Sequence, residues 1–254
     1  MNIFTPFNDL IMAVTEAGLN KIIYISWNFF SCALCVAFCF FYRKKYGIRA
    51  LESILMPMIT CLVGYGFILL LGWAHTGFRY FGEINIVKAF SFFPILAFIF
   101  TWVFKIEFNR IADFIAPSLA ILQFFSHFAC NITGCCLGYP MEHGIWNPIF
   151  KMYLFPVQLL ESFVALLVAI ICIIVAKKNE FRVTGRIYPL FLILFGSTRF
   201  FLEFLRVNIK LFAGISELAL WALLMVIVGA VWLIIDKKQA AENQKRSKRK
   251  VKKV

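Results

Sequence analysis

The sequence predicts an all-α, polytopic integral membrane protein with seven transmembrane helices. Two observations predict this class. Hydrophobic residues make up 62% of the 254 residues and the mean hydropathy is +0.83, which leaves too little polar surface for a soluble globule of this length. The apolar residues also gather in seven stretches, each long enough to cross a hydrocarbon layer of about 30 Å as a helix.

The predicted spans follow from hydropathy alone. They run approximately over residues 22–42, 54–73, 86–104, 112–133, 157–176, 187–205 and 218–235. No span alternates apolar and polar residues in the manner of a strand, so a β-barrel is not expected. Residues 1–21 have neither a positive segment nor the usual small-residue cleavage site, so we expect a short interfacial helix there instead of a signal peptide.

Lysine and arginine predict the orientation. Most of these 26 residues follow the first, third, fifth and seventh spans, at residues 43–49, 105–110, 177–186 and 237–253. The positive-inside rule places these segments in the cytoplasm, with the N-terminus outside and the C-terminus inside. We therefore expect a seven-helix membrane domain, residues 1–236, and a disordered basic cytoplasmic tail, residues 237–254, that lies against anionic lipid. The net charge of +13 then reflects topology, and no nucleic-acid partner is expected.

The eight cysteines form no recognisable ligand pattern. Five lie inside apolar spans, where cysteine behaves as a small hydrophobe. Cys130, Cys135 and Cys136 lie near the expected outer end of the fourth span, but the adjacent pair is poorly placed to form a disulfide and no histidine pattern completes a zinc site. We expect structural cysteines, no metal and no cofactor, while a disulfide from Cys130 to either neighbour stays open.

Polar residues at membrane depth are the informative feature, because an ionisable group there is costly unless it is paired or faces a polar cavity. Three spans carry such residues on one face each: Asp113, Gln123, His127 and Asn131 in the fourth, Gln158 and Glu161 in the fifth, and Arg199, Glu203 and Arg206 in the sixth. We expect these spans to enclose one polar chamber that opens toward the outer leaflet.

Two interpretations of this chamber are open. Membrane helices use amides and paired charges to hold one another, so Arg199 and Glu203 can serve as interhelical contacts. The gathering of many polar groups at one depth favours a cavity that faces a ligand. Arginine near an interface suits a lipid phosphate, because its planar fork donates two hydrogen bonds. The loop at 131–140, with Gly134 and Gly138, breaks the helix at the membrane surface, as backbone along a wet cavity can do.

Three stretches resemble motifs of the prolipoprotein diacylglyceryl transferase family, bacterial inner-membrane enzymes with seven helices and an outer N-terminus. Residues 111–117 and 130–138 look like the family's Ala-Asp-x-x-Ala-Pro run and its signature loop. Residues 155–161, Phe-Pro-Val-Gln-Leu-Leu-Glu, are similar to its His-Pro-x-Gln-Leu-Tyr-Glu. Residues 185–186 and 196–206 resemble the start of the sixth span and the Arg-Phe-x-x-Glu-x-x-Arg that ends it. The likeness covers about residues 105–235.

The resemblance implies transfer of a diacylglyceryl group from phosphatidylglycerol to the lipobox cysteine of a preprolipoprotein, with a thioether formed and glycerol phosphate released. The implied partners are phosphatidylglycerol, the preprolipoprotein signal peptide and membrane lipids, in the bacterial plasma membrane. By this resemblance Arg199 and Arg206 bind the phosphate and Glu203 holds Arg199. The expected catalytic residues are His127, Arg199 and Glu203, and the expected substrate-binding residues are Asn131, Gly134, Gln158, Glu161 and Arg206.

The chain departs from the family pattern at four positions, and its second span contains no arginine. Phe93 stands where the family has a histidine, and His127 where the signature loop has an arginine. Phe155 and Leu160 replace the histidine and tyrosine of the fifth-span motif. Since phenylalanine neither accepts a proton nor binds phosphate, two alternatives to an active transferase stay open. One is an inactive or repurposed lipid-binding relative, and the other is a small membrane transporter.

Overall fold

A computed structural model describes residues 3–75, 86–207, 210–212 and 214–251 of the chain. Among these residues, seven helices are long and apolar enough to cross a membrane, which confirms the predicted fold class and number of spans. They are α2 (Asn20–Tyr42), α3 (Ala50–His75), α4 (Ile86–Phe104), α5 (Phe108–Thr133), α6 (Val157–Lys178), α7 (Ile187–Leu202) and α8 (Glu217–Val251).

Shorter elements connect these helices. The helix α1 (Thr5–Glu16) forms where a short N-terminal helix was expected, and the 3-10 helices η1 (Arg43–Tyr46) and η2 (Glu203–Leu205) follow α2 and α7. Two antiparallel hairpins were not predicted, because strands this short give no sustained alternation in the sequence. They pair β1 (Pro140–Asn147) with β2 (Met152–Leu154), and β3 (Lys210–Phe212) with β4 (Ile215–Ser216).

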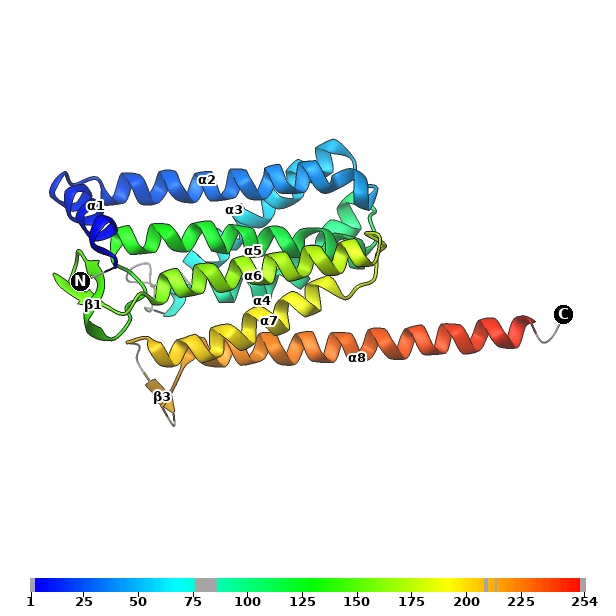
Figure 1. Ribbon diagram of the computed structural model, residues 1–254. Helices are drawn as coiled ribbons and strands as arrows, with labels where there is room; N and C mark the ends of the chain where they lie inside the picture. The colour runs from blue at the N-terminus through cyan, green and yellow to red at the C-terminus, as the bar shows by residue number, and fades with distance from the viewer. Residues whose placement is uncertain (1–2, 76–85, 208–209, 213, 252–254) are drawn as a thin grey trace.

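The two ends of the helix bundle differ (Figure 1). The helix α1 and both hairpins lie at one end, which we call the hairpin end. The connections between α2 and α3, between α4 and α5 and between α6 and α7 lie at the opposite end, and they carry the basic residues of 43–49, 105–107 and 177–186. We call this the basic end. A hairpin end that faces outward stays a prediction from the positive-inside rule.

The last helix, α8, extends beyond the other helices at its C-terminal end (Figure 1). Its basic segment after residue 236 is helical as far as Val251, and not disordered as expected. The physical reason is composition, because Ala, Gln, Glu, Lys and Arg are strong helix formers. The boundary between a membrane domain and a tail at residue 236 stays a prediction, and residues 252–254 lie outside the described part of the chain.

The helix α5 lies at the centre of the bundle. Inside the protein, 78% of its apolar stretch is buried, against 17% for α2. It packs against α2, α4, α6 and α7, and the small, fully buried Ala112, Ala116 and Ala120 allow these neighbours to approach closely. Polar side chains of α5 therefore face protein groups or internal space instead of lipid.

Asp113 joins α5 to the start of α7 at the basic end. Its Oδ2 accepts hydrogen bonds from the backbone N–H groups of Thr184 (3.0 Å) and Gly185 (2.8 Å), and its Oδ1 accepts one from Ile187 N–H (2.9 Å). The carboxylate thus satisfies donors that the first turn of a helix leaves free. Because Asp113 lies on the same helix face as Gln123 and His127, we expected it to line the polar chamber with them. The structure shows that it does not.

Replacing Asp113 by alanine is expected to destabilise the protein by about 3 kcal/mol, because several buried backbone donors lose a charged acceptor. Asp113→Asn should fall between wild type and alanine, since one oxygen remains. Unfolding in detergent by chemical denaturant measures the loss. Ser118→Ala is the control: Ser118 Oγ donates to Ile115 O within the same helix, so its loss should cost below about 1 kcal/mol. Equal effects of the two alanine variants would contradict the prediction.

Candidate active site

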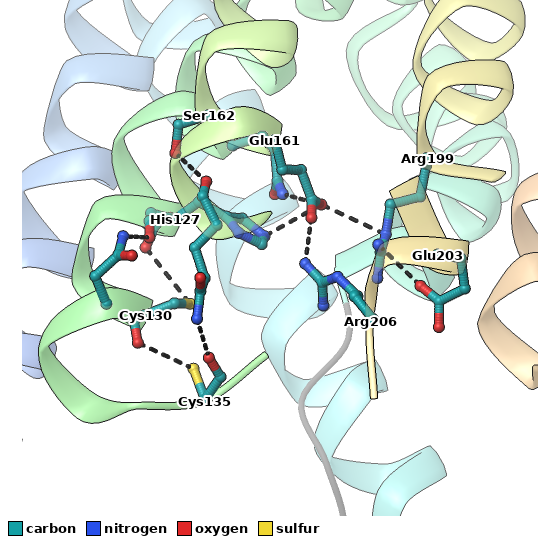
Figure 2. Close-up of polar contacts among 12 residues, drawn as sticks. His127, Cys130, Cys135, Glu161, Ser162, Arg199, Glu203 and Arg206 are labelled. Atoms are coloured by element: carbon teal, nitrogen blue, oxygen red, sulfur yellow. Dashed lines mark hydrogen bonds and ion pairs between the residues drawn. The ribbon is translucent and has the colours of Figure 1, made fainter. Parts of the chain in front are cut away.

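Glu161 of α6 is the centre of a buried polar cluster at the hairpin end. Its Oε1 lies 3.4 Å from Arg199 Nε and 3.3 Å from His127 Nε2, and it accepts a hydrogen bond from Gln123 Nε2 (3.1 Å). Its Oε2 accepts a hydrogen bond from Arg206 Nη2. Figure 2 shows Glu161 between His127 on one side and the two arginines on the other. One carboxylate therefore joins side chains of α5, of α7 and of the segment after η2.

A second carboxylate balances the charge. Arg199 Nη1 lies 2.9 Å from Glu203 Oε2, as the four-residue spacing predicted, and Ser216 Oγ donates to Glu203 Oε1 at 2.8 Å. The two arginines and two glutamates are each about 2% exposed or less. Burial of four ionised groups is tolerable only because each has an oppositely charged partner within reach. We call Gln123, His127, Glu161, Arg199, Glu203 and Arg206 the arginine–glutamate cluster.

Several buried atoms around the cluster have no hydrogen-bond partner among the described residues. They include His127 Nδ1, Arg206 Nε, Gln123 Oε1, Ser126 Oγ and Asn131 Oδ1. Arg199 Nε and Nη1 face carboxylates at short distance but without hydrogen-bond alignment. Folded proteins pair nearly all such groups, with protein, water or ligand. In a cluster that served only to hold helices together, these donors and acceptors would be expected to pair with one another. The unpaired polar atoms therefore favour a site that faces a ligand.

The cluster borders a cavity of ≈ 530 Å³, which we call the chamber. One wall is polar and includes Gln123, Ser126, His127, Glu161, Arg199 and Arg206. The remaining wall is largely apolar and aromatic, with Ile68, Phe90, Phe92, Phe93, Leu96 and Leu119 from α3, α4 and α5. A cavity with one charged and one apolar wall suits an amphipathic molecule that carries an anionic group.

The loop after α5 positions Arg206. Gly134 ends α5 in the left-handed conformation at φ 72°, where glycine carries no steric penalty. Gln158 Nε2 then donates to Cys135 O (2.7 Å), and Val207 N–H donates to Leu137 O (2.9 Å). The backbone of Arg206 itself forms an isolated β-bridge with Gly138. The loop and the residue that follows η2 are therefore fixed to each other.

Gly138→Ala is expected to reduce activity about 10²-fold, because a displacement of about 1 Å at a reacting group has an effect of this size. A Cβ at Gly138 would lie 2.2 Å from the backbone oxygen of Phe155, so the loop must move, and Arg206 with it. The measurement is the rate of the reaction proposed below. Gly66→Ala is the matched control, because a Cβ there meets nothing within 4 Å; if both variants retain wild-type rates, the loop does not position Arg206.

The three cysteines of this region lie together. The Sγ atoms of Cys130, Cys135 and Cys136 are all within 4.8 Å of one another, and all three thiols are free. The three residues line the chamber beside the cluster. Interactions with the Cys130 and Cys135 thiols, together with the nearby charge of Arg206, hold the pKa of Cys136 well below its ordinary value. The sequence placed these residues near one another but did not predict that three thiols converge.

The structure separates the eight expected site residues into two groups. His127, Gly134, Glu161, Arg199 and Arg206 line the chamber. Asn131, Gln158 and Glu203 do not line the chamber but contact residues that do. Asn131 Nδ2 donates to His127 O at 3.1 Å, Gln158 Nε2 donates to Cys135 O in the loop, and Glu203 pairs with Arg199. Their catalytic and substrate-binding roles stay predictions.

The N-terminal half of the chain contributes part of the chamber wall, which the sequence did not predict. Tyr24 and Asn28 of α2 and Tyr65 of α3 line the chamber, and Tyr65 Oη donates to Asn28 Oδ1 at 2.9 Å. An asparagine within an apolar span was the available signal. The structure also ends α7 before Arg206, which is extended at φ −107° and ψ 146°, so Arg206 is not on the same helix face as Arg199 as expected.

The positions that depart from the family pattern differ in their surroundings. Phe93 is buried, lines the chamber and packs on Tyr188 with ring centroids 5.0 Å apart. Leu160 is 37% exposed on the outer surface of α6, so its side chain does not line the chamber. His127, which stands where the family's loop has an arginine, lines the chamber and contacts Glu161.

Comparison with known proteins agrees with the resemblance. A family model described as prolipoprotein diacylglyceryl transferase matches residues 84–235, a range that contains the whole arginine–glutamate cluster. The phosphatidylglycerol–prolipoprotein diacylglyceryl transferase of Clostridium tetani is 32% identical over 104 residues, which are 38% of this chain and 41% of that protein.

Two further relatives are phosphatidylglycerol–prolipoprotein diacylglyceryl transferases 2 and 1 of Clostridium perfringens. They are 25% identical over 131 residues and 30% identical over 151 residues, which cover 49% and 55% of this chain and 50% and 57% of the relatives. The chain thus spans about half the length of the curated relatives it matches. With its seven apolar helices and these bacterial relatives, it is a multi-pass protein of the bacterial inner membrane.

Proposed function

The chain belongs to the prolipoprotein diacylglyceryl transferase family, and we propose that it transfers the diacylglyceryl group of phosphatidylglycerol to the lipobox cysteine of a preprolipoprotein. One observation carries the proposal: two buried arginines, with donor atoms that lack a hydrogen-bond partner among the described residues, stand at the polar wall of a chamber whose other wall is apolar. Such a chamber matches a phospholipid, whose phosphate needs charged donors and whose acyl chains need apolar surroundings.

The arginines bind the phosphate and stabilise it as it leaves. Arg206 offers Nε, which has no hydrogen-bond partner among the described residues, and Arg199 adds a buried positive charge whose Nε and Nη1 face carboxylates without hydrogen-bond alignment. Glu203 and Glu161 hold these side chains in place through ion pairs. Charge that develops on the phosphate oxygen as the carbon–oxygen bond breaks is then met by donors that are already oriented.

The acceptor thiol must lose its proton, because the thiolate is the nucleophile. We assign this step to His127, whose Nε2 faces Glu161 and whose Nδ1 has no hydrogen-bond partner among the described residues. Nδ1 takes the thiol proton, the sulfur attacks the glycerol carbon, and glycerol phosphate leaves with the electrons of the broken carbon–oxygen bond. The acceptor is the signal peptide of a preprolipoprotein, which reaches the chamber from the hairpin end and the outer leaflet.

Direct assay tests the proposal. Membranes that contain the protein are incubated with phosphatidylglycerol and a lipobox peptide, and the expected products are free glycerol phosphate and a peptide whose mass has increased by one diacylglyceryl group. The same protein is expected to restore growth of cells depleted of their own transferase. Absence of both products, together with failure to restore growth, would overturn the proposal.

A second candidate is a lipid-binding relative without catalysis. The observation that favours it is Phe93, which stands at the chamber wall where the family has a histidine and is held there by Tyr188. For this candidate, the purified protein retains phosphatidylglycerol in detergent but releases no glycerol phosphate when peptide is added. A protein that neither retains the lipid nor turns it over contradicts both candidates.

A further inference from the structure

Three thiols converge at the wall of the chamber. Cys130 lies in the last turn of α5, and Cys135 and Cys136 lie in the loop that follows. Within the described part of the chain, this is the one group of three or more histidine, cysteine and carboxylate side chains whose ligand atoms all lie within 4.8 Å of one another. Two of these thiols donate long hydrogen bonds, Cys130 to Ser126 O and Cys135 to Cys130 O, both at 3.8 Å.

The spacing of the sulfur atoms fits a metal ion. Zinc binds thiolates at about 2.3 Å in a tetrahedral arrangement, which places the sulfur atoms about 3.8 Å apart. Sulfur atoms already within 4.8 Å of one another reach that separation through small side-chain rotations. The backbone contributes as well, because Cys136 adopts the left-handed conformation at φ 61°, which is unfavourable for a residue with a side chain.

The positive charge near the three thiols also suits a bound divalent cation. Three thiolates and one divalent cation carry a single net negative charge. Arg206 and His127 line the same chamber as Cys136. A guanidinium beside a metal thiolate group stabilises its excess charge, whereas three neutral thiols would gain nothing from that neighbour. A disulfide would use two of the three sulfur atoms and leave the third without a role.

We propose that Cys130, Cys135 and Cys136 bind one thiophilic divalent cation, Zn²⁺ in the first place, and that its fourth coordination position receives the thiol of the acceptor cysteine. The three cysteines and both arginines line the same chamber, so an acceptor thiol inside the chamber would be near both the cation and the phosphate-binding arginines. The role of this position rests on the proposed transferase function. The binding of the cation does not.

The chemistry of the step is that of a metal-bound thiol. A thiol that coordinates such a cation loses its proton near neutral pH, and His127 Nδ1 receives that proton. The bound sulfur attacks the glycerol carbon, the carbon–oxygen bond to phosphate breaks, and both electrons leave with the phosphate oxygen. The product thioether is neutral and a weak ligand, so it leaves the cation. No oxidant or reductant takes part. The cation thereby supplies the activation that Phe93 cannot supply.

Metal analysis of the purified full-length protein tests the binding site. After loading with Zn²⁺ and desalting, mass spectrometry should find about one Zn²⁺ per chain. Cys130→Ser, Cys135→Ser and Cys136→Ser should each reduce the bound metal at least about tenfold. Cys172→Ser is the matched control, because Cys172 is a buried cysteine of α6 outside the group, and it should keep the wild-type metal content.

A measurement on the wild-type protein avoids dependence on variants that fail to fold. Bound Zn²⁺ should protect Cys130, Cys135 and Cys136 from alkylation, and removal of the metal by a chelator should restore their labelling. Absence of metal and of protection in a folded wild-type protein would overturn the proposal. So would a chain that, without reductant, has two of these cysteines joined in a disulfide and binds no Zn²⁺.

The fourth position is tested with Co²⁺ in place of Zn²⁺, because thiolate ligands give an absorption band in the near ultraviolet. A lipobox peptide should increase this band, and the same peptide with serine in place of its cysteine should leave it unchanged. An unchanged band with both peptides would overturn the fourth-ligand role. If Co²⁺ binds and the peptide raises the band but no thioether forms with phosphatidylglycerol, the transferase function fails while the metal site stands.

Discussion

Glu161→Gln is expected to abolish measurable transfer and to lower the free energy of unfolding by about 3–5 kcal/mol, the cost of removing one partner from a buried ion pair. Glu161 is 1% exposed and is the shared partner of Arg199, Arg206 and His127. Glutamine keeps nearly the same shape and a hydrogen bond to Gln123. The change therefore removes little besides the negative charge and leaves two buried guanidinium groups with one carboxylate, that of Glu203.

The measurements are product formation with phosphatidylglycerol and lipobox peptide, and denaturant unfolding in detergent. Glu180→Gln is the matched control: Glu180 pairs with Arg182 at 2.8 Å, but both side chains are largely exposed, so stability should change by at most about 0.5 kcal/mol. Glu161→Gln combined with Arg206→Gln should be less destabilised than the sum of the two single variants, because the second change removes the uncompensated charge. Additive losses would contradict a direct Glu161–Arg206 coupling.

Hydropathy was sufficient to predict the membrane fold, because a helix satisfies its own backbone and needs only length and apolar side chains to span the bilayer. All seven predicted spans correspond to helices of the structure. Hydropathy says nothing about the elements outside the hydrocarbon region. The hairpin of β1 and β2 depends on pairing between two short strands, in which Trp146 lies opposite Tyr153. Strands this short produce no periodic hydrophobic pattern in the sequence.

The site was predictable where it depends on local spacing. Arg199 and Glu203 are four residues apart, and their ion pair follows from helix geometry. The prediction that Asp113 lines the chamber was wrong, because it used the position on the helix face and not the distance along the helix axis. Ten residues separate Asp113 from Gln123, which is about 15 Å at 1.5 Å per residue. Asp113 therefore lies toward the basic end, where it holds the start of α7.

The contacts that make the cluster a single unit are long-range and could not be predicted from spacing. Glu161 meets Arg206 across 45 residues and Gln123 across 38. These contacts depend on how α5, α6 and α7 pack. They also depend on the change from α-helix to 3-10 helix at Glu203, which the sequence did not predict and after which Arg206 has an extended backbone. The convergence of Cys130 with Cys135 and Cys136 likewise depends on the left-handed turn at Gly134.

Arg206→Lys is expected to slow transfer by about 10²–10³-fold, the effect of removing one oriented donor from a site where charge develops, while the protein stays folded. Lysine keeps the positive charge that Glu161 requires, so the buried charges remain balanced. It does not keep the planar fork. Arg206 uses Nη2 on Glu161 and leaves Nε free, so one guanidinium can contact the carboxylate and the phosphate together, whereas a single ammonium cannot reach both with the same geometry.

The split between stability and rate is the diagnostic result. Unfolding should change much less than in Glu161→Gln, because lysine keeps an oppositely charged partner for the buried Glu161, whereas glycerol phosphate release should fall by orders of magnitude. Arg186→Lys is the matched control, because Arg186 precedes α7, pairs with Asp236 at 3.4 Å, is half exposed and does not line the chamber. If Arg206→Lys retains the wild-type rate, the guanidinium does not bind the phosphate, and Arg206 serves only to neutralise Glu161.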